Sequence, residues 1–449
     1  MQRLRRRNEK IHLSFKRPSV PLLSLMSNEV RQQWQARRGL PCSYTKCTVM
    51  VRRVWLLKQV IKMKPKICFV NPPVLLKRPV SEIIRKLTKK GFKTSLLIPK
   101  ILFKRRHTSL HHCKQVEKSR IYTYSIINPP FVSAEQPLPI TPMFCINTWK
   151  AIKNNNIIHM WVPYYLTSFF ILLTKRVFFP EKKLILTMDT VPGYSFSMGR
   201  FWNTMFKIYN KLFGWLLFGT PSIITLYGES MLPFALRAGV PKQKIRVIPT
   251  GIDFKKYDNK SKLQSKASIS KELNLKPSTR IILFVGLLIP RKGVDKLIRI
   301  ANNLRRRDVV FLLVSDGPNR KEYENQVKKL RLEKKVLFLG WRTDMHKLYQ
   351  ASDIFLLPSQ GEGLPGVVME AMSYGVPCVA SNIPCIPDLL ENGITGFLCK
   401  RTNVNDFTAK IGKLLRNKNL RERIAKQGIR KIKGFEWSKV LSKYEKLYV

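Results

Sequence analysis

Short apolar runs alternate with stretches of helical character along most of the sequence, and this alternation constrains the fold more than any other feature. Thirteen runs rich in β-branched residues read KICFV, TSLLIP, IYTYSI, IIHMWVP, LILTMD, SIITLY and RVIPTG between residues 66 and 251, then RIILFVG, VVFLLVSDGP, KVLFLG, IFLLPS, PCVAS and GFLCK up to residue 400. Strands joined by helical crossovers form parallel sheets with helices on their faces. The sequence therefore predicts two consecutive doubly wound, Rossmann-like α/β domains.

The length of 449 residues agrees with two domains, because a single hydrophobic core rarely extends over so long a chain. We expect the first domain at 63–253 and the second at 280–449. Residues 254–279 are polar and rich in Lys and Ser, which predicts a linker between the domains. The helices expected within 406–448 are predicted to include one that crosses back to the first domain.

The first 62 residues differ in character from the rest. They contain Arg clusters and polar pieces with no sustained period, and they carry +13 of the formal net charge of +56. We expect a basic, disordered extension outside the fold. Because MKPKICFV opens as a first strand of such a domain does, Met63 is a candidate biological start; no signal-peptide pattern precedes it.

The remaining positive charge is distributed through the fold and has four possible meanings. It suits nucleic acid, an anionic membrane surface, phosphate-bearing substrates, or a Lys-biased proteome. The eight cysteines show no spacing typical of zinc sites, so we expect free thiols in a reducing cytosol. No apolar run reaches the roughly 18–20 residues that span a bilayer.

Residues 354–372, IFLLPSQGEGLPGVVMEAM, form the most informative stretch of the chain. The run Ile354–Leu357, ended by Pro358, predicts a buried strand, and Val367–Met372 predicts a helix. The turn between them contains Gly361, Gly363 and Gly366. Glycines let the backbone approach a ligand closely, and a helix start offers unpaired amides and a positive dipole end. This turn is therefore a candidate anion site.

Two glutamates flank this turn, Glu362 and Glu370, spaced so that both can face one ligand. With E-G-L-P, E-A-M and G-V-P at 375–377, they resemble the E-x7-E motif of retaining glycosyltransferase family four. The resemblance covers roughly residues 64–449 and implies GT-B architecture, two Rossmann-like domains facing a cleft, with a nucleotide-sugar donor. It also implies that Glu370 binds the ribose hydroxyls, that Glu362 contacts the transferred sugar, and that the Gly363–Leu364 backbone approaches sugar and phosphate.

The segment after the strand at 280–285 resembles the family's G-R-x4-K-G pattern, with Gly286, Arg291 and Lys292 at matching places. A departing nucleoside diphosphate gains negative charge, so cations held there stabilise the transition state more than the ground state. Lys292 is the first choice for this role, with Arg291 beside it. Leu287 stands where the family usually has an Arg.

Two further segments resemble donor-binding parts of the family. Residues 336–353 resemble the segment that holds the base, near Trp341 and Arg342, and VIPTGID places Thr250 and Gly251 in the family's I-P-N-G-V-D turn. No D-x-D motif occurs in the sequence. We therefore expect a metal-independent enzyme whose only co-substrate is the nucleotide-sugar.

The segments expected on the acceptor side match the family pattern less well than the donor segments do. NPPVLLKRPV replaces the usual glycine-rich loop after the first strand, and Met188 stands where relatives often carry a His. Asp189 either orients the acceptor hydroxyl or caps a loop. His159, in IIHMW, is expected to be a satisfied histidine at a strand end.

Aromatic and basic residues interleave at 161–179 and 200–218. Such segments form either amphipathic helices that lie on anionic membranes or core helices of the first domain. Together these features predict a retaining glycosyltransferase that moves a sugar from a UDP- or GDP-sugar to a glycan or lipid-linked acceptor in cell-surface polysaccharide or glycolipid synthesis. We expect it in the cytoplasm, peripheral on the inner face of the plasma membrane.

Two alternatives stay open at this level. One is a GT-B sugar epimerase, against which the E-x7-E spacing and the missing His speak. The other is a basic membrane- or nucleic-acid-binding relative without turnover, which the departures at Leu287 and Met188 would suit. No specific nucleic-acid partner is expected for the enzyme itself.

Overall fold

The computed structural model describes most of the chain after residue 63. The described residues are 64–73, 76–101, 116, 119–126, 139, 141–196, 199–254 and 262–449. The predicted extension at 1–62 and the candidate start at Met63 lie outside them. The chain from Lys64 to Val449 forms one compact unit.

Seven parallel strands form the first sheet, in the order β3-β2-β1-β4-β5-β6-β7. Their bounds are Ile67–Val70 (β1), Thr94–Ile101 (β2), Arg120–Ile126 (β3), Ile157–Trp161 (β4), Lys183–Met188 (β5), Ile223–Leu226 (β6) and Ile245–Val247 (β7). β1 lies inside the sheet, with Ile67 beside Thr94 on one side and Ile157 on the other. The order reverses between β1 and β4, which is where ligands bind in such sheets. We call this sheet and its helices the first lobe.

Six parallel strands form the second sheet, in the order β10-β9-β8-β11-β12-β13. Their bounds are Arg280–Val285 (β8), Val309–Val314 (β9), Val336–Gly340 (β10), Ile354–Leu357 (β11), Cys378–Ser381 (β12) and Phe397–Cys399 (β13). Here the order reverses between β8 and β11, whose residues Ile282 and Ile354 pair. This sheet and its helices are the second lobe. Each of the thirteen predicted runs contains a strand, so the prediction of two parallel-sheet α/β domains is confirmed.

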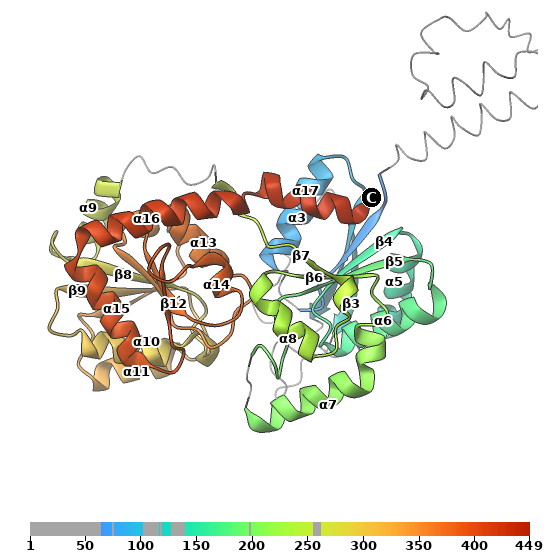
Figure 1. The fold of residues 1–449 in the computed structure, drawn as a ribbon, viewed down its shortest axis with the longest axis horizontal. Helices are drawn as coiled ribbons and strands as arrows, with labels where there is room; N and C mark the ends of the chain where they lie inside the picture. Colours follow the sequence, from blue (N-terminus) through green and yellow to red (C-terminus); the bar gives the residue numbers. More distant parts are fainter. Residues whose placement is uncertain are drawn as a thin grey trace, which may run out of the picture. The chain divides into compact units, whose positions relative to one another are not determined.

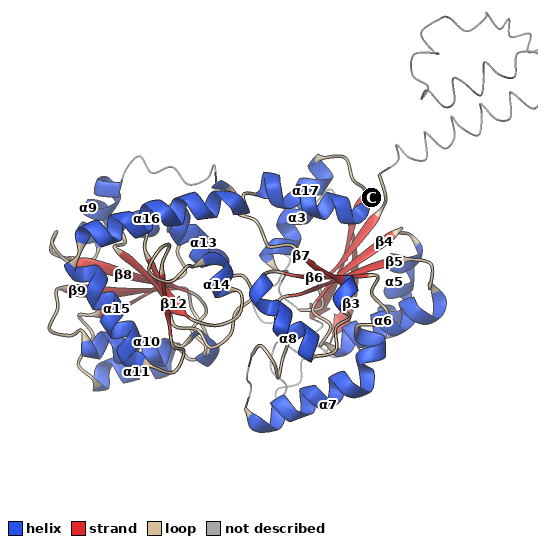
Figure 2. Ribbon diagram, in the orientation of Figure 1, coloured by secondary structure: helices blue, strands red, loops and turns tan. Residues whose placement is uncertain are grey.

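Helices cover both sheets (Figure 1 and Figure 2). In the first lobe they are α3 (Arg78–Lys89), α5 (Pro142–Lys153), α6 (Leu166–Phe178), α7 (Arg200–Leu217) and α8 (Leu232–Arg237). The second lobe contains α9 (Lys262–Glu272), α10 (Val294–Asn303), α11 (Arg320–Lys329), α12 (Met345–Ala351), α13 (Gly366–Ser373), α14 (Ile386–Leu389), α15 (Val404–Arg416) and α16 (Lys418–Ile432), and α17 (Trp437–Tyr448) ends the chain. In α3, buried Val80, Ile83, Ile84 and Leu87 form the apolar stripe that faces the sheet.

The segment expected as a polar linker, 254–279, contains helix α9. Ser265 on α9 donates a hydrogen bond of 2.6 Å to Gln350 on α12. Only Ser265, Ile269 and Ser270 of α9 are buried, so the helix has no apolar stripe that the sequence could reveal. α9 is attached to the second lobe by polar contacts instead.

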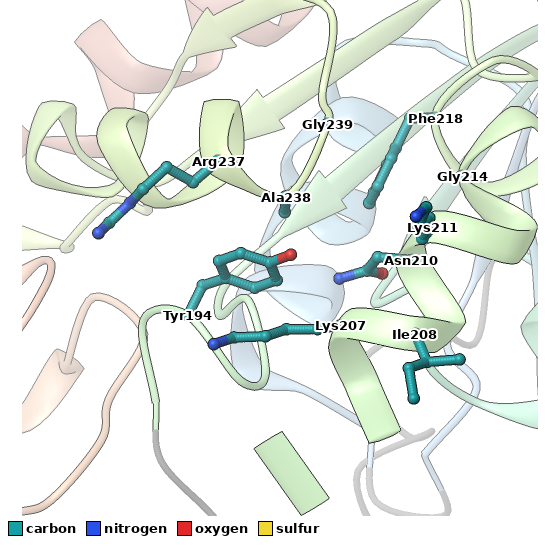
Figure 3. Close-up of a pocket in the computed structure, with 10 residues that line it drawn as sticks. All are labelled: Tyr194, Lys207, Ile208, Asn210, Lys211, Gly214, Phe218, Arg237, Ala238 and Gly239. Atoms are coloured by element: carbon teal, nitrogen blue, oxygen red, sulfur yellow. The ribbon is translucent and has the colours of Figure 1, made fainter. Parts of the chain in front are cut away.

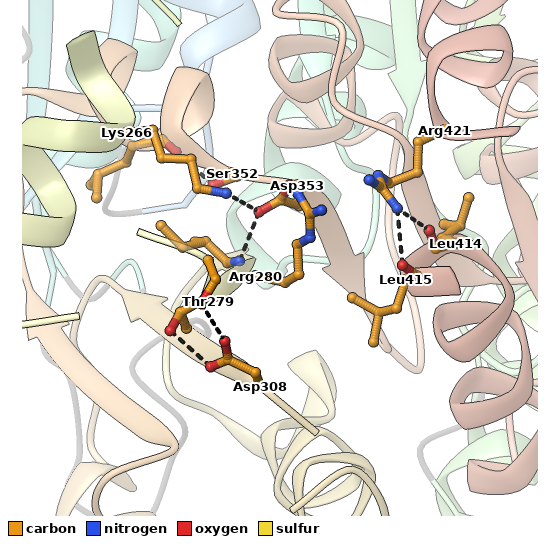
Figure 4. Close-up of polar contacts among 12 residues, drawn as sticks. Lys266, Thr279, Arg280, Asp308, Ser352, Asp353, Leu414, Leu415 and Arg421 are labelled. Atoms are coloured by element: carbon orange, nitrogen blue, oxygen red, sulfur yellow. Dashed lines mark hydrogen bonds and ion pairs between the residues drawn. The ribbon is translucent and has the colours of Figure 1, made fainter. Parts of the chain in front are cut away.

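Asp353, at the start of β11, accepts hydrogen bonds from both α9 and β8 (Figure 4). Its carboxylate accepts from Lys266 of α9 at 2.8 Å, from Arg280 of β8 at 2.9 Å and from the Ile281 amide at 3.0 Å. Burial raises the pKa of Asp353, but the hydrogen bonds from Lys266 and the Ile281 amide outweigh it and hold the pKa below its usual value. The ionised carboxylate therefore joins α9 to the sheet.

The chain crosses from the first lobe to the second and later crosses back, and backbone hydrogen bonds join the two crossing segments. The Ile252 amide donates to the Phe435 carbonyl at 2.9 Å, and the Trp437 amide donates to the Ile252 carbonyl at 3.0 Å. After this crossing α17 packs on the first lobe, where Glu445 pairs with Lys90 at 2.7 Å. The chain's last helix thus belongs structurally to the first lobe.

His159 anchors the end of α17 to the first sheet. It is fully buried on β4, with Nδ1 2.6 Å from the Tyr448 hydroxyl and Nε2 2.7 Å from the Thr187 hydroxyl. Burial lowers the pKa of His159 to about 3. The expectation of a satisfied histidine is confirmed.

None of the helices within the described ranges is long and apolar enough to cross a membrane. The described cysteines are Cys68, Cys145, Cys378, Cys385 and Cys399, all of them free thiols, and only Cys145 is exposed.

The neutral His159 makes stability depend on pH. The unfolded chain binds a proton at this residue below about pH 6.5, whereas the folded chain does so only near pH 3. Stability is therefore full above about pH 6.5 and falls as the pH decreases toward 3, by up to about 1.4 kcal/mol per pH unit. We expect the melting temperature to fall between about pH 7.5 and pH 5, and to fall less in His159→Gln.

The matched control is His346→Gln, which removes an exposed histidine on α12. Its melting temperature should follow the pH as that of the unmodified chain does. Equal pH dependence in all three proteins would contradict this account of His159.

Candidate active site

The loop between β11 and α13, residues 358–365, lies where the sequence placed the candidate anion site. β11 and α13 confirm the predicted strand, loop and helix. Because the order of the second sheet reverses between β8 and β11, the loops that follow these two strands meet at its ligand-binding edge. We call residues 358–365 the donor loop.

The loop after β8 brings two predicted cations onto the donor loop. Lys292 Nζ lies 2.7 and 3.0 Å from the two carboxylate oxygens of Glu362, which is 7% exposed. Arg291 donates to the Gly361 carbonyl at 2.7 Å and lies 3.9 Å from Glu362. The structure therefore brings together the three residues predicted to be catalytic.

Gly293 makes this close approach possible. Its φ of +72° is in the left-handed region, and a Cβ there would lie 2.2 Å from the Pro358 carbonyl oxygen. A side chain at this position would push the two loops apart. Gly286 lies nearby, where an added Cβ would be 3.6 Å from the Lys292 side chain.

Glu370 is buried on α13 and is held by partners other than those of Glu362. The Tyr349 hydroxyl of α12 donates to its Oε2 at 2.7 Å, and Arg78 of the first lobe pairs with its Oε1. The Tyr349 ring stacks on Tyr374, with 5.5 Å between centroids. Glu370 therefore has a fixed orientation, with contacts to both lobes.

Lys77 and Arg78 are site residues that the sequence analysis missed. Both follow β1, at the ligand-binding edge of the first sheet, within the segment that replaces the glycine-rich loop. Lys77 pairs with Asp189, and its amide donates to Asn71 at 3.1 Å. The signal available in the sequence was this basic pair directly before the proline at the start of a helix. Its acidic partners, Asp189 and Glu370, lie far away in the sequence.

Asp189 lies against the donor loop. It follows β5, and a Cβ added at Gly363 would lie 3.1 Å from the Asp189 Cβ. On the same side, a Cβ added at Gly361 would lie 2.2 Å from the Phe196 ring. The donor loop thus packs on the first lobe as well as on the loop after β8.

The remaining predicted residues lie in other contacts. Arg342 pairs with Glu272 of α9 at 2.5 Å and with Asp344 at 2.8 Å, and these hydrogen bonds raise its pKa. Trp341 is 74% exposed. Their predicted role toward the base stays a prediction.

Thr250 and Leu364 are buried, and Gly251 lies at the crossing between the lobes. A Cβ added at Gly251 would lie 2.5 Å from the Trp437 ring, so this glycine makes room for the start of α17. The motif position is therefore occupied by a residue with a packing function.

Acidic and basic side chains are paired in the part of the site that the structure describes. Glu362, Glu370 and Asp189 are partly or fully buried, and each is paired with a cation. Including Arg291, the cations outnumber these carboxylates, which suits a ligand that carries negative charge. Among the described residues, no group of three or more His, Cys, Asp or Glu side chains is arranged to hold a metal ion.

Comparison with known proteins identifies the family. The model of the family "Glycosyl transferases group 1" matches residues 265–431. The chain is 33% identical over 284 residues to the UDP-Gal:alpha-D-GlcNAc-diphosphoundecaprenol alpha-1,3-galactosyltransferase of Escherichia coli, covering 58% of this chain and 68% of that protein. The chain belongs to the group 1 glycosyltransferases. The family resemblance read from the E-x7-E stretch is confirmed, and the enzymatic class is glycosyl transfer.

Other members of this group and several solved structures are similar over large parts of the chain. The N-acetyl-alpha-D-glucosaminyl L-malate synthase of Bacillus anthracis is 28% identical over 228 residues, covering 50% of this chain and 59% of that protein. Anabaena Alr3699/HepE, crystallised with UDP and glucose, gives a TM-score of 0.69 at 18% identity over 85% of this chain and 99% of its own. Sucrose-phosphate synthase of Thermosynechococcus elongatus gives 0.68 at 18% identity, over 86% and 98%. These structures confirm the GT-B fold.

The Lys292–Glu362 pair predicts that removing the lysine lowers both turnover and stability. We expect Lys292→Ala to lower turnover about 100-fold or more, because a cation beside a leaving group acts mainly in the transition state. The variant should also lose about 3 kcal/mol of stability, because Glu362 is left buried without its partner. Initial rates and thermal unfolding measure the two effects.

Arg299→Ala is the matched control, because Arg299 is an exposed cation on the neighbouring helix α10. It should change neither quantity. Full turnover in Lys292→Ala would exclude the proposed role of this lysine.

Proposed function

We propose that this glycosyltransferase moves a sugar from a UDP- or GDP-sugar to a glycan or lipid-linked acceptor, with retention of the anomeric configuration. The observation that carries the proposal is the donor loop, where buried Glu362 lies beside Arg291 and Lys292, and which leads directly into α13 with buried Glu370. Carboxylates suit the hydroxyls of a sugar and a ribose, and cations with free helix amides suit a diphosphate.

The donor would be held from both of its ends. Glu370, which accepts from Tyr349, would accept hydrogen bonds from the ribose hydroxyls. Lys292, Arg291 and the Gly363–Leu364 backbone would hold the diphosphate and the sugar. Gly286 would leave space beside Lys292, and Trp341, Arg342, Thr250 and Gly251 remain the candidate contacts for the nucleoside.

Glu362 is better suited to positioning than to nucleophilic attack. Both of its oxygens accept from Lys292, so the carboxylate is directed toward that cation. We therefore propose a reaction on one face of the sugar. The bond between the anomeric carbon and the phosphate oxygen breaks, the acceptor oxygen bonds to the same face, and the acceptor proton passes to the departing phosphate. Arg291 and Lys292 stabilise the charge that develops there.

The acceptor would approach from the first lobe. Asp189, which pairs with Lys77 and lies against the donor loop, would orient an acceptor hydroxyl. A lipid-linked acceptor is supported by the relative from Escherichia coli, whose name gives a diphosphoundecaprenol acceptor. Such an acceptor would be met on the cytoplasmic membrane surface, in the synthesis of a cell-surface polysaccharide or glycolipid.

The first experiment is a screen of UDP- and GDP-sugars by thermal shift and by hydrolysis, run with a chelator, since the proposed chemistry needs no metal ion. One donor should bind and stabilise the protein. Glu370→Gln should raise the KM for that donor about 10- to 100-fold, as expected for a lost hydrogen bond to a charged group. Glu422→Gln, at an exposed glutamate on α16, is the control.

Two outcomes would count against the donor assignment. Loss of activity with the chelator, restored by Mg²⁺ or Mn²⁺, would exclude metal independence. An unchanged donor KM in Glu370→Gln would remove Glu370 from the ribose site. A chain that binds no donor and promotes no turnover would instead favour a non-catalytic relative.

The stereochemistry of transfer is tested separately. We expect the product formed from an α-linked nucleotide-sugar to carry an α-linkage, because attack and departure share one face of the sugar. The anomeric coupling constant in the proton NMR spectrum of freshly formed product reports the configuration. A β-linked product would exclude the proposed mechanism while leaving the donor site intact.

A further inference from the structure

The outer surface of the first lobe has an unusual distribution of apolar side chains. Of the twenty large apolar residues that are exposed in the described part of the chain, thirteen lie on α5, α6 and α7. They are Met143, Ile146, Trp149, Leu166, Phe170, Val177, Phe178, Phe201, Trp202, Met205, Ile208, Leu212 and Trp215. We call this set the three-helix face. Apolar patches of this kind mark interaction surfaces.

The three-helix face is continuous across its helices. Trp149 of α5 and Phe178 of α6 contact each other edge to face, with 5.1 Å between ring centroids. Arg176 of α6 lies 5.1 Å from the ring of Trp215 on α7. α5 packs beside α6, and α6 packs beside α7, which lies at the outside of the first lobe in Figure 1.

Helix α7 contributes the largest share of this face. Phe201, Met205, Ile208, Leu212 and Trp215 are spaced by four, three, four and three residues, so they line one side of the helix. All five are between 43% and 68% exposed, and only Asn210, Leu216 and Leu217 of the eighteen residues are buried. An apolar stripe therefore faces outward instead of toward the sheet.

The charge of the three-helix face indicates which kind of partner it suits. α5, α6 and α7 contain no Asp or Glu, whereas Lys150, Lys153, Arg176, Arg200, Lys207 and Lys211 are exposed on them. Aromatic and apolar side chains combined with cations suit a bilayer surface that carries anionic lipids. A purely apolar protein partner would not require a surface on which all charged side chains are positive.

A basic hollow of about 550 Å³ lies beside α7 (Figure 3). Its lining includes Lys207, Lys211, Arg237 and Tyr194, with no acidic residue. The buried side chain of Asn210 also lines it. The hollow offers donors for a lipid phosphate next to the apolar stripe.

We infer that the three-helix face docks on a bilayer that contains anionic lipids. The apolar stripe of α7 enters the boundary between head groups and acyl chains, and Lys207 and Lys211 contact lipid phosphates. The inference rests on the proposed function only for its purpose, since docking would bring a lipid-linked acceptor to the lobe that carries Asp189. Binding itself requires neither donor nor acceptor.

Vesicle co-sedimentation of the full chain tests the inference. Vesicles consist of phosphatidylcholine alone or mixed with an equal amount of phosphatidylglycerol. We expect binding to the mixed vesicles, weakened by high salt, and a loss of about tenfold or more in Phe201→Ser/Leu212→Ser/Trp215→Ser. Lys207→Gln/Lys211→Gln should lose part of the preference for the anionic vesicles.

The matched control removes three exposed apolar residues from the second lobe, Leu263→Ser/Leu330→Ser/Ile394→Ser. It should bind vesicles as the unmodified chain does. Binding that remains equal in the α7 and control variants would overturn the inference and assign binding to another part of the chain, and self-association in place of vesicle binding would make the face an interface between copies.

Thermal unfolding and donor binding are measured on every variant. Unchanged values show that a loss of vesicle binding comes from the surface and not from misfolding. Vesicle binding without any donor binding would leave this inference intact and count against the proposed function, so the two fail independently.

Discussion

The site depends on the close packing of the donor loop, which touches the loop after β8 on one side and the first lobe on the other. Gly293 leaves space for the Pro358 carbonyl, and Gly361 and Gly363 leave space for Phe196 and Asp189. A side chain at Gly293 would separate the loop that carries Lys292 from the loop that carries Glu362, and a side chain at Gly361 would push the donor loop away from Phe196. The glycines therefore determine the electrostatics of the site, although they carry no charge.

Each buried carboxylate of the site has a cation from a distant part of the sequence. Lys292 pairs with Glu362, Arg78 with Glu370, and Lys77 with Asp189. A buried ion without a partner is costly, so these pairs offset the cost of burying the carboxylates before any ligand binds. Sugar hydroxyls and phosphates can then exchange with partners that are already in place, which is the basis of electrostatic preorganisation.

The sequence predicted what depends on local pattern and missed what depends on distant contacts. Strands buried on both faces, such as β1, β9 and β11, appear as continuous apolar runs, so the sequence shows them directly. Helix α9 was missed because polar contacts to Gln350 and Asp353 hold it. Lys77 and Arg78 gain their meaning only from Asp189 and Glu370, more than a hundred residues away.

Helix α7 bears on two interpretations that the sequence left open. Aromatic residues interleaved with cations at 161–179 and 200–218 fitted either core helices or helices on a membrane. α6 has five buried residues and contacts its neighbours as a covering helix does, whereas α7 has three among eighteen. Leaving six large apolar side chains of α7 in water is unfavourable. Burial of that stripe against a bilayer would recover this free energy, so the same residues that weaken the case for a core helix supply the driving force for docking.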